Sequence, residues 1–257
     1  MGNVVVFGNQ KGGVGKSTLA TLYACWLADV QQKSVCLIDL DAQANSSKSL
    51  CRFATGVEAA GLFGPDPLSI MPCSKQGIAL VAGSRRLADI ELAKPEAVIP
   101  AFRRNVMRLV PDFDTVVIDT PPALGLRMSA ALMSATAVVC PIELEEYSID
   151  GLTDMLKTIF GVRRRYNSQL SLAGVVLNRF NPHSQRQKVA MLELIADFGE
   201  FVVPARISTR SAIPEALAAG VPVWQLSKSA AREASLEVMR VFELLQRRIA
   251  ALAGASA

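Results

Sequence analysis

A glycine-rich stretch directly behind an apolar segment has the residue types and spacing for binding phosphate groups. It spans residues 8–18, reads GNQKGGVGKST, and follows the segment VVVF. Glycines let successive backbone N–H groups point inward, and a helix that follows presents its positive end to the same anion. The residues that we expect to surround a bound triphosphate are Lys11, Gly12, Gly13, Val14, Gly15, Lys16, Ser17 and Thr18.

Two side chains of this stretch have separate expected roles. Lys16 would reach the β and γ phosphates of a nucleotide, and the Ser17 hydroxyl would bind Mg²⁺. The strict P-loop pattern requires a glycine five residues before Gly15, where this chain has Gln10. A glycine-rich turn with two solvated lysines is the alternative. We favour the nucleotide site because the stretch lies between a strand pattern and a helix pattern.

Carboxylates follow two apolar segments that have the pattern of buried strands. Asp39 and Asp41 come at the end of one such segment, and Asp119 ends another. The carboxyl ends of parallel strands lie along one edge of a sheet, so we expect these acids to converge on the ligand of the glycine-rich loop. Asp119 would hold hydrated Mg²⁺ opposite Ser17. The alternative for Asp41 and Asp119 is a purely local role, such as capping a turn.

Strand and helix patterns alternate along the chain. The alternation predicts an α/β fold with a mostly parallel twisted sheet and helices on both faces. No repeat or linker divides the sequence, so we expect a single domain over residues 1–257. The spacing of apolar residues predicts strands at 4–7, 34–40, 78–82, 113–118, 137–141, 172–177 and 201–203, and helices at 19–30, 45–53, 100–110, 149–165, 185–198 and 230–252. The helix at 100–110 would begin with a proline.

The composition points to a cytoplasmic protein. Hydrophobic residues make up 51% of the chain, but no apolar run reaches the roughly 18 residues that span a bilayer. A strand at the very start leaves no room for a signal peptide. The cysteines form no C-x-x-C pair, so we expect reduced core residues. They are Cys25, Cys36, Cys51, Cys73 and Cys140.

The net charge of +4 is unevenly distributed. Residues 1–150 carry 13 basic and 15 acidic side chains, whereas residues 151–257 carry 14 and 8. A basic C-terminal half suggests a surface for a polyanion. A solvated helix face would give a similar distribution.

The loop and the acidic segments together resemble the ParA/MinD group of ATPases. Lys11 at the start of the loop is similar to the first lysine of their deviant P-loop (deviant Walker A), and residues 39–45 are similar to their D-x-D-P-Q segment, with Ala42 replacing the proline. Segments 141–148, 212–216 and 220–224 resemble short plasmid-borne ParA proteins of the IncC-like type. The resemblance spans nearly the whole chain and includes no N-terminal DNA-reading extension.

This resemblance implies catalytic roles and cofactors. In the family, the residue matching Lys11 crosses a nucleotide-sandwich dimer and contacts the phosphates held by the partner. Lys16 would act on the phosphates of its own subunit, Asp41 would position the attacking water, and Asp39 would support the metal shell. The implied cofactors are ATP and Mg²⁺.

Recognition of the base is implied at two further positions. Asn178, at a predicted strand end, resembles the family's adenine-contacting asparagine, and the loop after Pro204 would lie on the other side of the base. An ordinary strand-end turn is the alternative for Asn178.

The family also implies a cycle. ATP binding forms a homodimer, the dimer binds DNA without sequence preference, and a ParB-type partner stimulates slow hydrolysis, which drives plasmid or chromosome segregation. The protein would then be nucleoid-associated with ATP. Phosphate contacts need only positive charge, and the DNA-binding candidates in the region that the family uses are Arg206, Arg210, Lys228 and Arg232. The alternative is that each of these side chains is only a solvated charge on the surface.

Two related functions remain open at this point. A ParA-like ATPase that positions a protein cargo would share the same chemistry and differ only in its partner. A MinD-like ATPase would attach to membranes through an amphipathic C-terminal helix. The segment 241–249 has a composition similar to such a helix. It is followed mainly by alanine and glycine, which provide no bulky apolar face, so we expect no stable membrane association. An electron carrier of the nitrogenase iron-protein type is excluded because residues 119–122 contain no cysteine.

Overall fold

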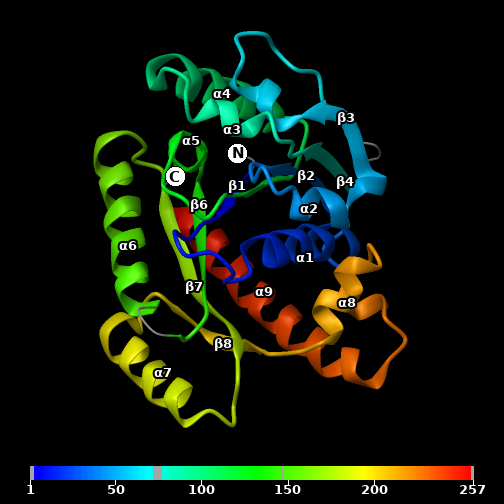
Figure 1. The fold of residues 1–257 in the computed structure, drawn as a ribbon, viewed down its shortest axis with the longest axis vertical. Coiled ribbons are helices and arrows are strands. Elements are labelled where there is room, and N and C mark those ends of the chain that lie inside the picture. The colour runs from blue at the N-terminus through cyan, green and yellow to red at the C-terminus, as the bar shows by residue number, and fades with distance from the viewer. Residues whose placement is uncertain (1–2, 72–76, 146–147, 256–257) are drawn as a thin grey trace.

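A parallel sheet of eight strands forms the centre of the computed structural model, which describes residues 3–71, 77–145 and 148–255 (Figure 1). The strand order is β3-β4-β2-β5-β1-β6-β7-β8, and every strand pair is parallel. The strands are β1 Asn3–Phe7, β2 Ser34–Asp39, β3 Ala54–Glu58, β4 Gly77–Ala82, β5 Thr115–Asp119, β6 Ala137–Ile142, β7 Ser171–Phe180 and β8 Val202–Ser208.

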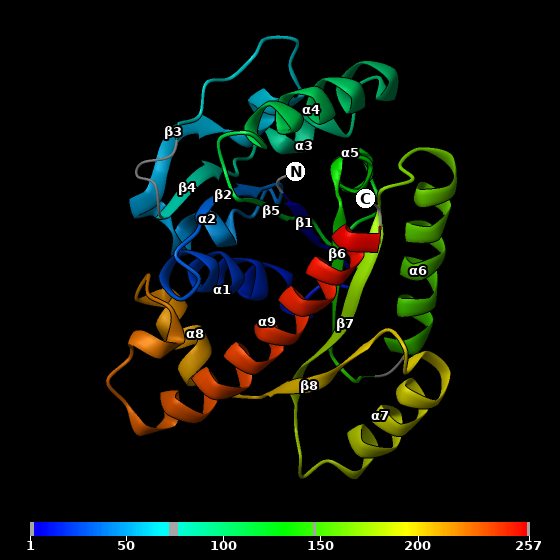
Figure 2. The ribbon, with the colours of Figure 1, turned by 180° about the vertical axis from the view of Figure 1, so that it is seen from behind.

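Helices cover both faces of this sheet. One face is packed by α1 (Lys16–Asp29), α8 (Ala212–Ala218) and α9 (Ser229–Ala255). The other is packed by α4 (Pro95–Leu109), α5 (Leu126–Ser134), α6 (Ser148–Arg165) and α7 (Gln185–Phe198). Figures 1 and 2 show α1 and α9 side by side from opposite directions. The short helices α2 (Asn45–Ser49) and α3 (Leu87–Ile90) follow β2 and β4. These two layers confirm the predicted α/β class.

The central strand β1 shows why the sheet needs two cover layers. Val4 and Val6 pack into the core beneath α4 to α6, whereas Val5 and Phe7 pack into the core beneath α1 and α9. All four side chains are fully buried. Successive side chains of a strand point to opposite faces, so an unbroken apolar run is stable only when both faces are covered. The loop that follows Phe7 therefore starts from the rigid centre of the molecule.

The long helix α9 is docked along its length. Val238, Val241, Phe242, Leu245 and Ile249 are all buried in the core that α9 shares with α1 and the sheet. Their spacing is that of one helix face. In the part of the chain that the structure describes, no helix is both long enough and hydrophobic enough to cross a bilayer.

Several predicted boundaries are wrong. The helix expected to begin at Pro100 begins at Pro95, and Pro100 lies inside it. Burial of Val98, Phe102 and Val106 along the same face stabilises these turns despite the N–H group that Pro100 lacks. The edge strand β3 was not predicted, because its alternate residues are only half-buried and give no apolar run.

The strand predicted to end at Val203 continues as β8 to Ser208, so Pro204 lies within a strand and the loop expected after it is absent from the described residues. Sheet edges tolerate proline because one side of an edge strand needs no donors. Three cysteines, Cys25, Cys36 and Cys140, are buried and free as predicted, whereas Cys51 is exposed. Cys73 lies outside the described residues.

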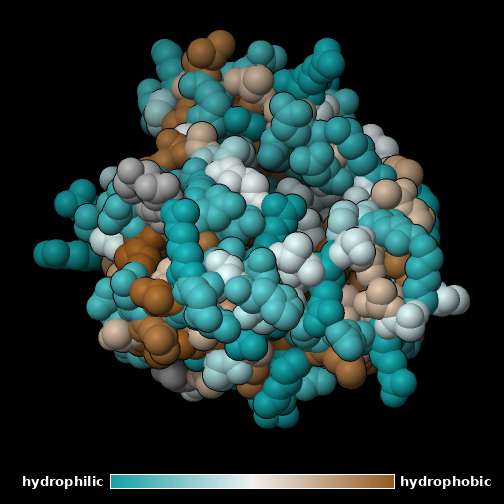
Figure 3. Space-filling view, turned by 60° about the horizontal axis from the view of Figure 1, so that its bottom comes forward, coloured by the Kyte–Doolittle hydropathy of each residue, from teal (hydrophilic) through white to brown (hydrophobic). Residues whose placement is uncertain are grey.

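Exposed hydrophobic side chains gather on the side of the molecule formed by α6 and α7. Figure 3 shows them as a cluster beside a mostly hydrophilic face. The exposed members on these helices are Phe160, Val189, Leu192 and Ile195.

Candidate nucleotide site at the carboxyl edge of the sheet

The glycine-rich loop ends in a tight turn at the start of α1. Gly15 is the N-cap of α1 and has φ 91°, which only glycine adopts readily. A Cβ atom there would collide with the Asn178 side chain, whose Nδ2 donates a hydrogen bond to the Val14 carbonyl (2.9 Å). Gly15 offers no side chain for a cap, and no side-chain cap bond to α1 is present among the described residues. The first N–H groups of the helix are therefore available to an anion.

The beginning of the loop is held by Asn9. Its Nδ2 donates to the Pro141 carbonyl at 2.7 Å, and its Oδ1 accepts from the Lys11 N–H at 3.0 Å. The Lys16 ammonium donates back to the Lys11 carbonyl at 2.9 Å. The Lys11 ammonium lies 3.7 Å from the Glu145 carboxylate of the same chain. Both predicted lysines therefore lie at the loop.

Lys16 is 6% exposed, and burial lowers the pKa of its ammonium. The charges of Asp119 and Asp41 oppose that shift. A buried ammonium is well suited to an anionic ligand, since the ligand's charge would help to compensate for its desolvation.

Asp39 ends β2 and is fully buried, with both of its carboxylate oxygens bonded. Oδ2 accepts from the Ser47 N–H (2.9 Å) and the Ser47 hydroxyl (2.7 Å), and Oδ1 accepts from the Asp41 N–H (3.0 Å). Burial raises the pKa of Asp39, and the hydrogen bonds from Ser47 and Asp41 work in the opposite direction. Gly83 packs directly behind this group, where a Cβ atom would lie 2.8 Å from the Asp41 carbonyl oxygen.

Asp119 ends the neighbouring strand β5 in register with Asp39. Its Oδ2 accepts from the Ser46 hydroxyl at 2.7 Å, and the Ser46 oxygen accepts in turn from Thr21. Its Oδ1 is buried and accepts no hydrogen bond within the described ranges. Burial raises the pKa of Asp119 to about 7, and the nearby charge of Asp39 acts in the same direction. The Ser17 and Ser46 side chains act in the opposite direction. A buried carboxylate oxygen without a partner indicates a position for a ligand such as a cation.

A pocket of about 250 Å³ joins the loop to the acidic segment. It contains most of the predicted phosphate-binding residues together with Asp41, and it adds three residues that the sequence reasoning missed. The lining residues are Gly12, Gly13, Gly15, Lys16, Ser17, Thr18, Asp41, Asn45, Pro122 and Arg179.

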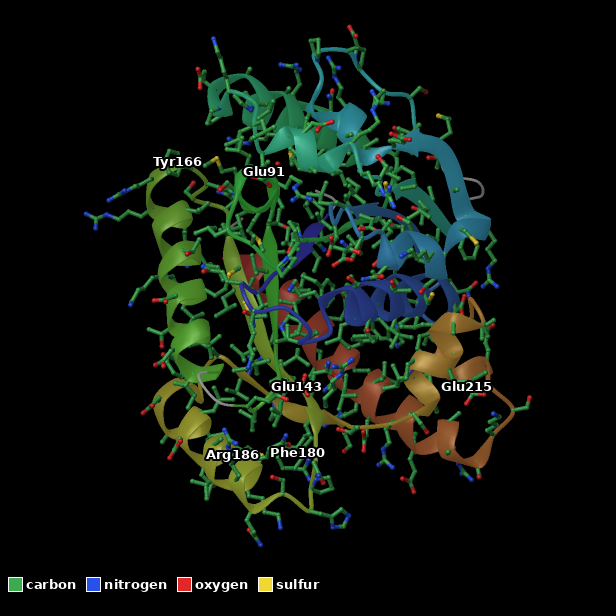
Figure 4. All side chains as sticks on the ribbon, in the orientation of Figure 1. Glu91, Glu143, Tyr166, Phe180, Arg186 and Glu215 are labelled. Atoms are coloured by element: carbon green, nitrogen blue, oxygen red, sulfur yellow. The ribbon has the colours of Figure 1, made fainter. Side chains whose placement is uncertain are left out.

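Arg179 is the most informative of the missed residues. Its Nη1 donates to the Gly13 carbonyl at 3.1 Å and lies 3.5 Å from the carboxylate of Glu143, which Figure 4 labels near the glycine-rich loop. Its backbone has φ 52°, which is uncommon for a residue other than glycine. Its position directly after Asn178, at a strand end, was the available signal.

Pro204 lies elsewhere. It lines a separate, mostly apolar cavity of about 290 Å³ between α7 and β8, together with Arg206. The Arg206 guanidinium lies 4.8 Å from the ring centroid of Phe180, which Figure 4 labels near the start of α7.

The remaining basic candidates differ in how they are paired. Arg210 forms ion pairs of 2.7 Å with both Glu233 and Glu237. Lys228 forms an ion pair with Glu215, which Figure 4 labels on α8. Arg232 is exposed on α9 and forms no ion pair among the described residues, and the adjacent Glu233 is paired with Arg210.

A doubly covered parallel sheet, with a glycine loop between the central strand and a helix and acids at the adjacent strand ends, defines a P-loop nucleotide-binding protein. Residues 2–172 match the family model described as an AAA domain. The chain is 40% identical over 244 residues to the protein IncC of Escherichia coli, covering 91% of this chain and 66% of that protein. It is 32% identical over 225 residues to the chromosome-partitioning ATPase Soj of Thermus thermophilus, covering 86% of this chain and 87% of Soj.

These matches identify the family. The chain belongs to the ParA/Soj family of partition ATPases, which confirms the resemblance described above. It spans 66% and 64% of the lengths of two IncC proteins of Escherichia coli.

Solved structures agree with this fold. A plasmid partition protein from Borrelia burgdorferi B31 bound to AMPPNP superposes with a TM-score of 0.77 at 21% identity, covering 96% of this chain and 100% of that one. Cobyrinic acid a,c-diamide synthase from Mycobacterium smegmatis, with a bound ATP analog and magnesium, gives a TM-score of 0.74 at 24% identity, covering 96% and 93%.

Proposed function

We propose that this chain binds ATP with Mg²⁺ in the pocket beside the glycine-rich loop and hydrolyses it. The observation that carries this proposal is the convergence of Lys16, Ser17 and Asp41 on that one pocket, beside a buried carboxylate oxygen of Asp119 that has no partner. Two proteins of the same fold were solved with ATP analogues, one of them with magnesium. The partition family of the chain supports the same activity.

The residues in and around the loop have separate roles in binding and hydrolysing the nucleotide. The uncapped N-terminus of α1 and the Lys16 ammonium bind the phosphates. Asp41 orients the attacking water, because it lines the same pocket as the loop residues. Asn178 contacts the adenine from the end of β7, and Lys11 reaches the phosphates held by a second subunit once its contact with Glu145 opens.

The donor set fits a hydrated Mg²⁺ ion. Ser17 and Asp119 would hold it through their side-chain oxygens, since oxygen ligands are the ones that this ion prefers. Asp39 supports this arrangement from the adjacent strand through its bonds to Asp41 and Ser47. When bound, the ion neutralises charge that develops on the phosphate oxygens.

The nucleotide state controls assembly in this proposal. The ATP-bound chain forms a homodimer, binds DNA without sequence preference and so associates with the nucleoid in the cytoplasm. A ParB-type partner then stimulates hydrolysis and release, which segregates a plasmid or chromosome. The partition proteins among the relatives support this cycle. Arg206 and Arg232 are the better DNA candidates, since Arg210 and Lys228 are already paired with carboxylates.

The membrane-attached alternative is disfavoured by α9. Membrane attachment through an amphipathic helix requires an apolar face that is free to enter the lipid. The apolar face of α9, from Val238 to Ile249, is buried against the sheet and α1.

The test is binding to a labelled duplex of arbitrary sequence at low salt, with ATP, ADP or no nucleotide, beside sedimentation with anionic liposomes. Retention of DNA only with ATP supports the proposal. Liposome binding without DNA binding overturns it in favour of a membrane-attached ATPase. A matched pair of variants, Arg232→Ala and Arg210→Ala, then tests where the DNA-binding surface lies. The first is expected to weaken DNA binding more, because only Arg210 is held by two carboxylates.

A further inference from the structure

A partly buried ion pair connects the C-terminal end of α3 to the start of α5, outside the pocket itself. The Arg127 Nε atom lies 2.8 Å from Glu91 Oε1, and their side chains are 11% and 30% exposed. Figure 4 shows Glu91 where α3 and α5 come together. Most surface ion pairs contribute little, whereas a buried arginine needs its hydrogen bonds satisfied.

Glu91 also caps α5. Its Oε2 accepts from the Leu126 N–H at 2.6 Å, and its Oε1 accepts from the Arg127 N–H at 3.4 Å. A carboxylate at this end of a helix is stabilised by the helix dipole. A Cβ atom at Gly125 would collide with the same carboxylate, so the loop from Asp119 to α5 closes directly onto Glu91.

The other end of Arg127 reaches the acidic segment after β2. Its Nη1 donates to the Leu40 carbonyl at 3.0 Å, and Leu40 lies between Asp39 and Asp41. The Leu40 N–H donates to the Asp119 carbonyl at 2.9 Å. Both polar groups of Leu40 are therefore bonded to the segment that runs from Asp119 into α5.

We propose that Arg127, held by Glu91, is a positioning residue that couples the segment after β2 to the segment after β5. This inference rests on the proposed ATPase function. Arg127 does not line the pocket, and it acts by fixing the Leu40 peptide and through it the position of Asp41 relative to Asp119. A planar guanidinium bonds two acceptors in fixed directions at once, which an ammonium does not do in the same way.

The first experiment separates this coupling from simple stability. Arg127→Met removes both bonds, and Arg127→Lys keeps a charge beside Glu91 but lacks the fork that also reaches Leu40. We expect both variants to bind ATP with wild-type affinity and to hydrolyse it more slowly, with kcat lowered on the order of tenfold or more, because small misplacements of catalytic groups are costly. Arg86→Met is the matched control, since Arg86 forms an exposed pair with Glu58 at the start of α3. It should retain the wild-type kcat.

The second experiment needs no activity. Hydrogen exchange of the peptide containing residues 40–44 should accelerate in Arg127→Met and Arg127→Lys and stay unchanged in Arg86→Met. Unchanged kcat and unchanged exchange in Arg127→Lys, or losses of ATP affinity and thermal stability that fully account for the lower rate, would overturn the proposal. Absence of ATP hydrolysis by the wild-type protein would refute the proposed function instead, and the exchange experiment would still decide the coupling.

Discussion

Two aspartates in register on neighbouring strands differ in how many hydrogen bonds their carboxylates accept. Asp39 at the end of β2 and Asp119 at the end of β5 are both fully buried. Asp39 accepts three hydrogen bonds over its two oxygens, whereas Asp119 has one oxygen bonded to Ser46 and one without a partner in the described residues. Buried polar atoms are normally paired. The comparison therefore separates a carboxylate that holds the fold from one that is left for a ligand.

The difference arises in the short helix α2, which lies beside both strand ends. Its consecutive residues Ser46 and Ser47 bond to different acids, Ser46 to Asp119 and Ser47 to Asp39. Ser47 uses its N–H and its hydroxyl, whereas Ser46 contributes the hydroxyl alone. A helix of five residues is not stable by itself. These contacts fix α2 and give each acid its distinct set of donors.

The largest expected effect is that of Asp119→Asn on catalysis. If the free oxygen holds Mg²⁺, loss of the charge should lower ATP hydrolysis by about 10³-fold, roughly 4 kcal/mol. Stability should change little, because asparagine can still accept the Ser46 bond, and the cost of burying a charge is exchanged for that of burying an unpaired amide. Phosphate release and thermal unfolding measure the two effects, with Asp112→Asn in an exposed turn as the control. Hydrolysis at the wild-type rate would remove Asp119 from the metal site.

Asp39→Asn is expected to act mainly on stability. The amide of asparagine would place a donor against the Ser47 or Asp41 N–H groups, so at least one buried hydrogen bond is lost. We expect a loss of about 3 kcal/mol in the free energy of unfolding, measured with urea. Equal stability changes for Asp39→Asn and Asp119→Asn would contradict the distinction between the two acids.

The serines of α2 provide a finer test. Ser47→Ala removes one of the bonds to Asp39 and one acceptor of the Gly83 N–H, and should cost about 1.5 kcal/mol. Ser46→Ala should cost a similar amount, about 1.5 kcal/mol, because it removes the bond to Asp119 and also the acceptor of the buried Thr21 hydroxyl. In a double-mutant cycle, Ser47→Ala should couple to Asp39→Asn and add independently to Asp119→Asn. Coupling of Ser47 to both acids would show that they form one network.

The sequence was sufficient for the fold class and for the loop. Apolar runs buried on both faces and the spacing of Lys11, Lys16 and Ser17 are local signals, and strand ends bring Asp39 and Asp119 to the same edge. The bonds that distinguish the two acids depend on side-chain directions across different elements, such as those of Ser46 and Ser47, which no periodicity encodes. Pro100 and Pro204 were misplaced for a related reason, because tertiary burial and an edge position outweighed their local preferences.

The smallest expected effect concerns Glu91, which no sequence pattern indicated. Burial opposes its ionisation, but hydrogen bonds from the Arg127 side chain and from the Leu126 and Arg127 N–H groups outweigh burial and hold the pKa of Glu91 below its ordinary value of 4.5. The folded state therefore binds this proton less tightly than the unfolded state. The resulting stabilisation is complete above that ordinary value and is lost as the pH falls through the lower folded-state pKa.

In Glu91→Gln the free energy of unfolding should therefore fall less steeply than in wild type as the pH is lowered. Urea unfolding from pH 6 to about pH 3 should show a gap between wild type and variant that narrows as the pH falls. Glu58→Gln, which removes the carboxylate of the exposed pair with Arg86, is the control variant. A gap that stays constant across this range would mean that Glu91 acts through packing alone, and that its charge does not support the contact between Arg127 and the segment carrying Asp39 and Asp41.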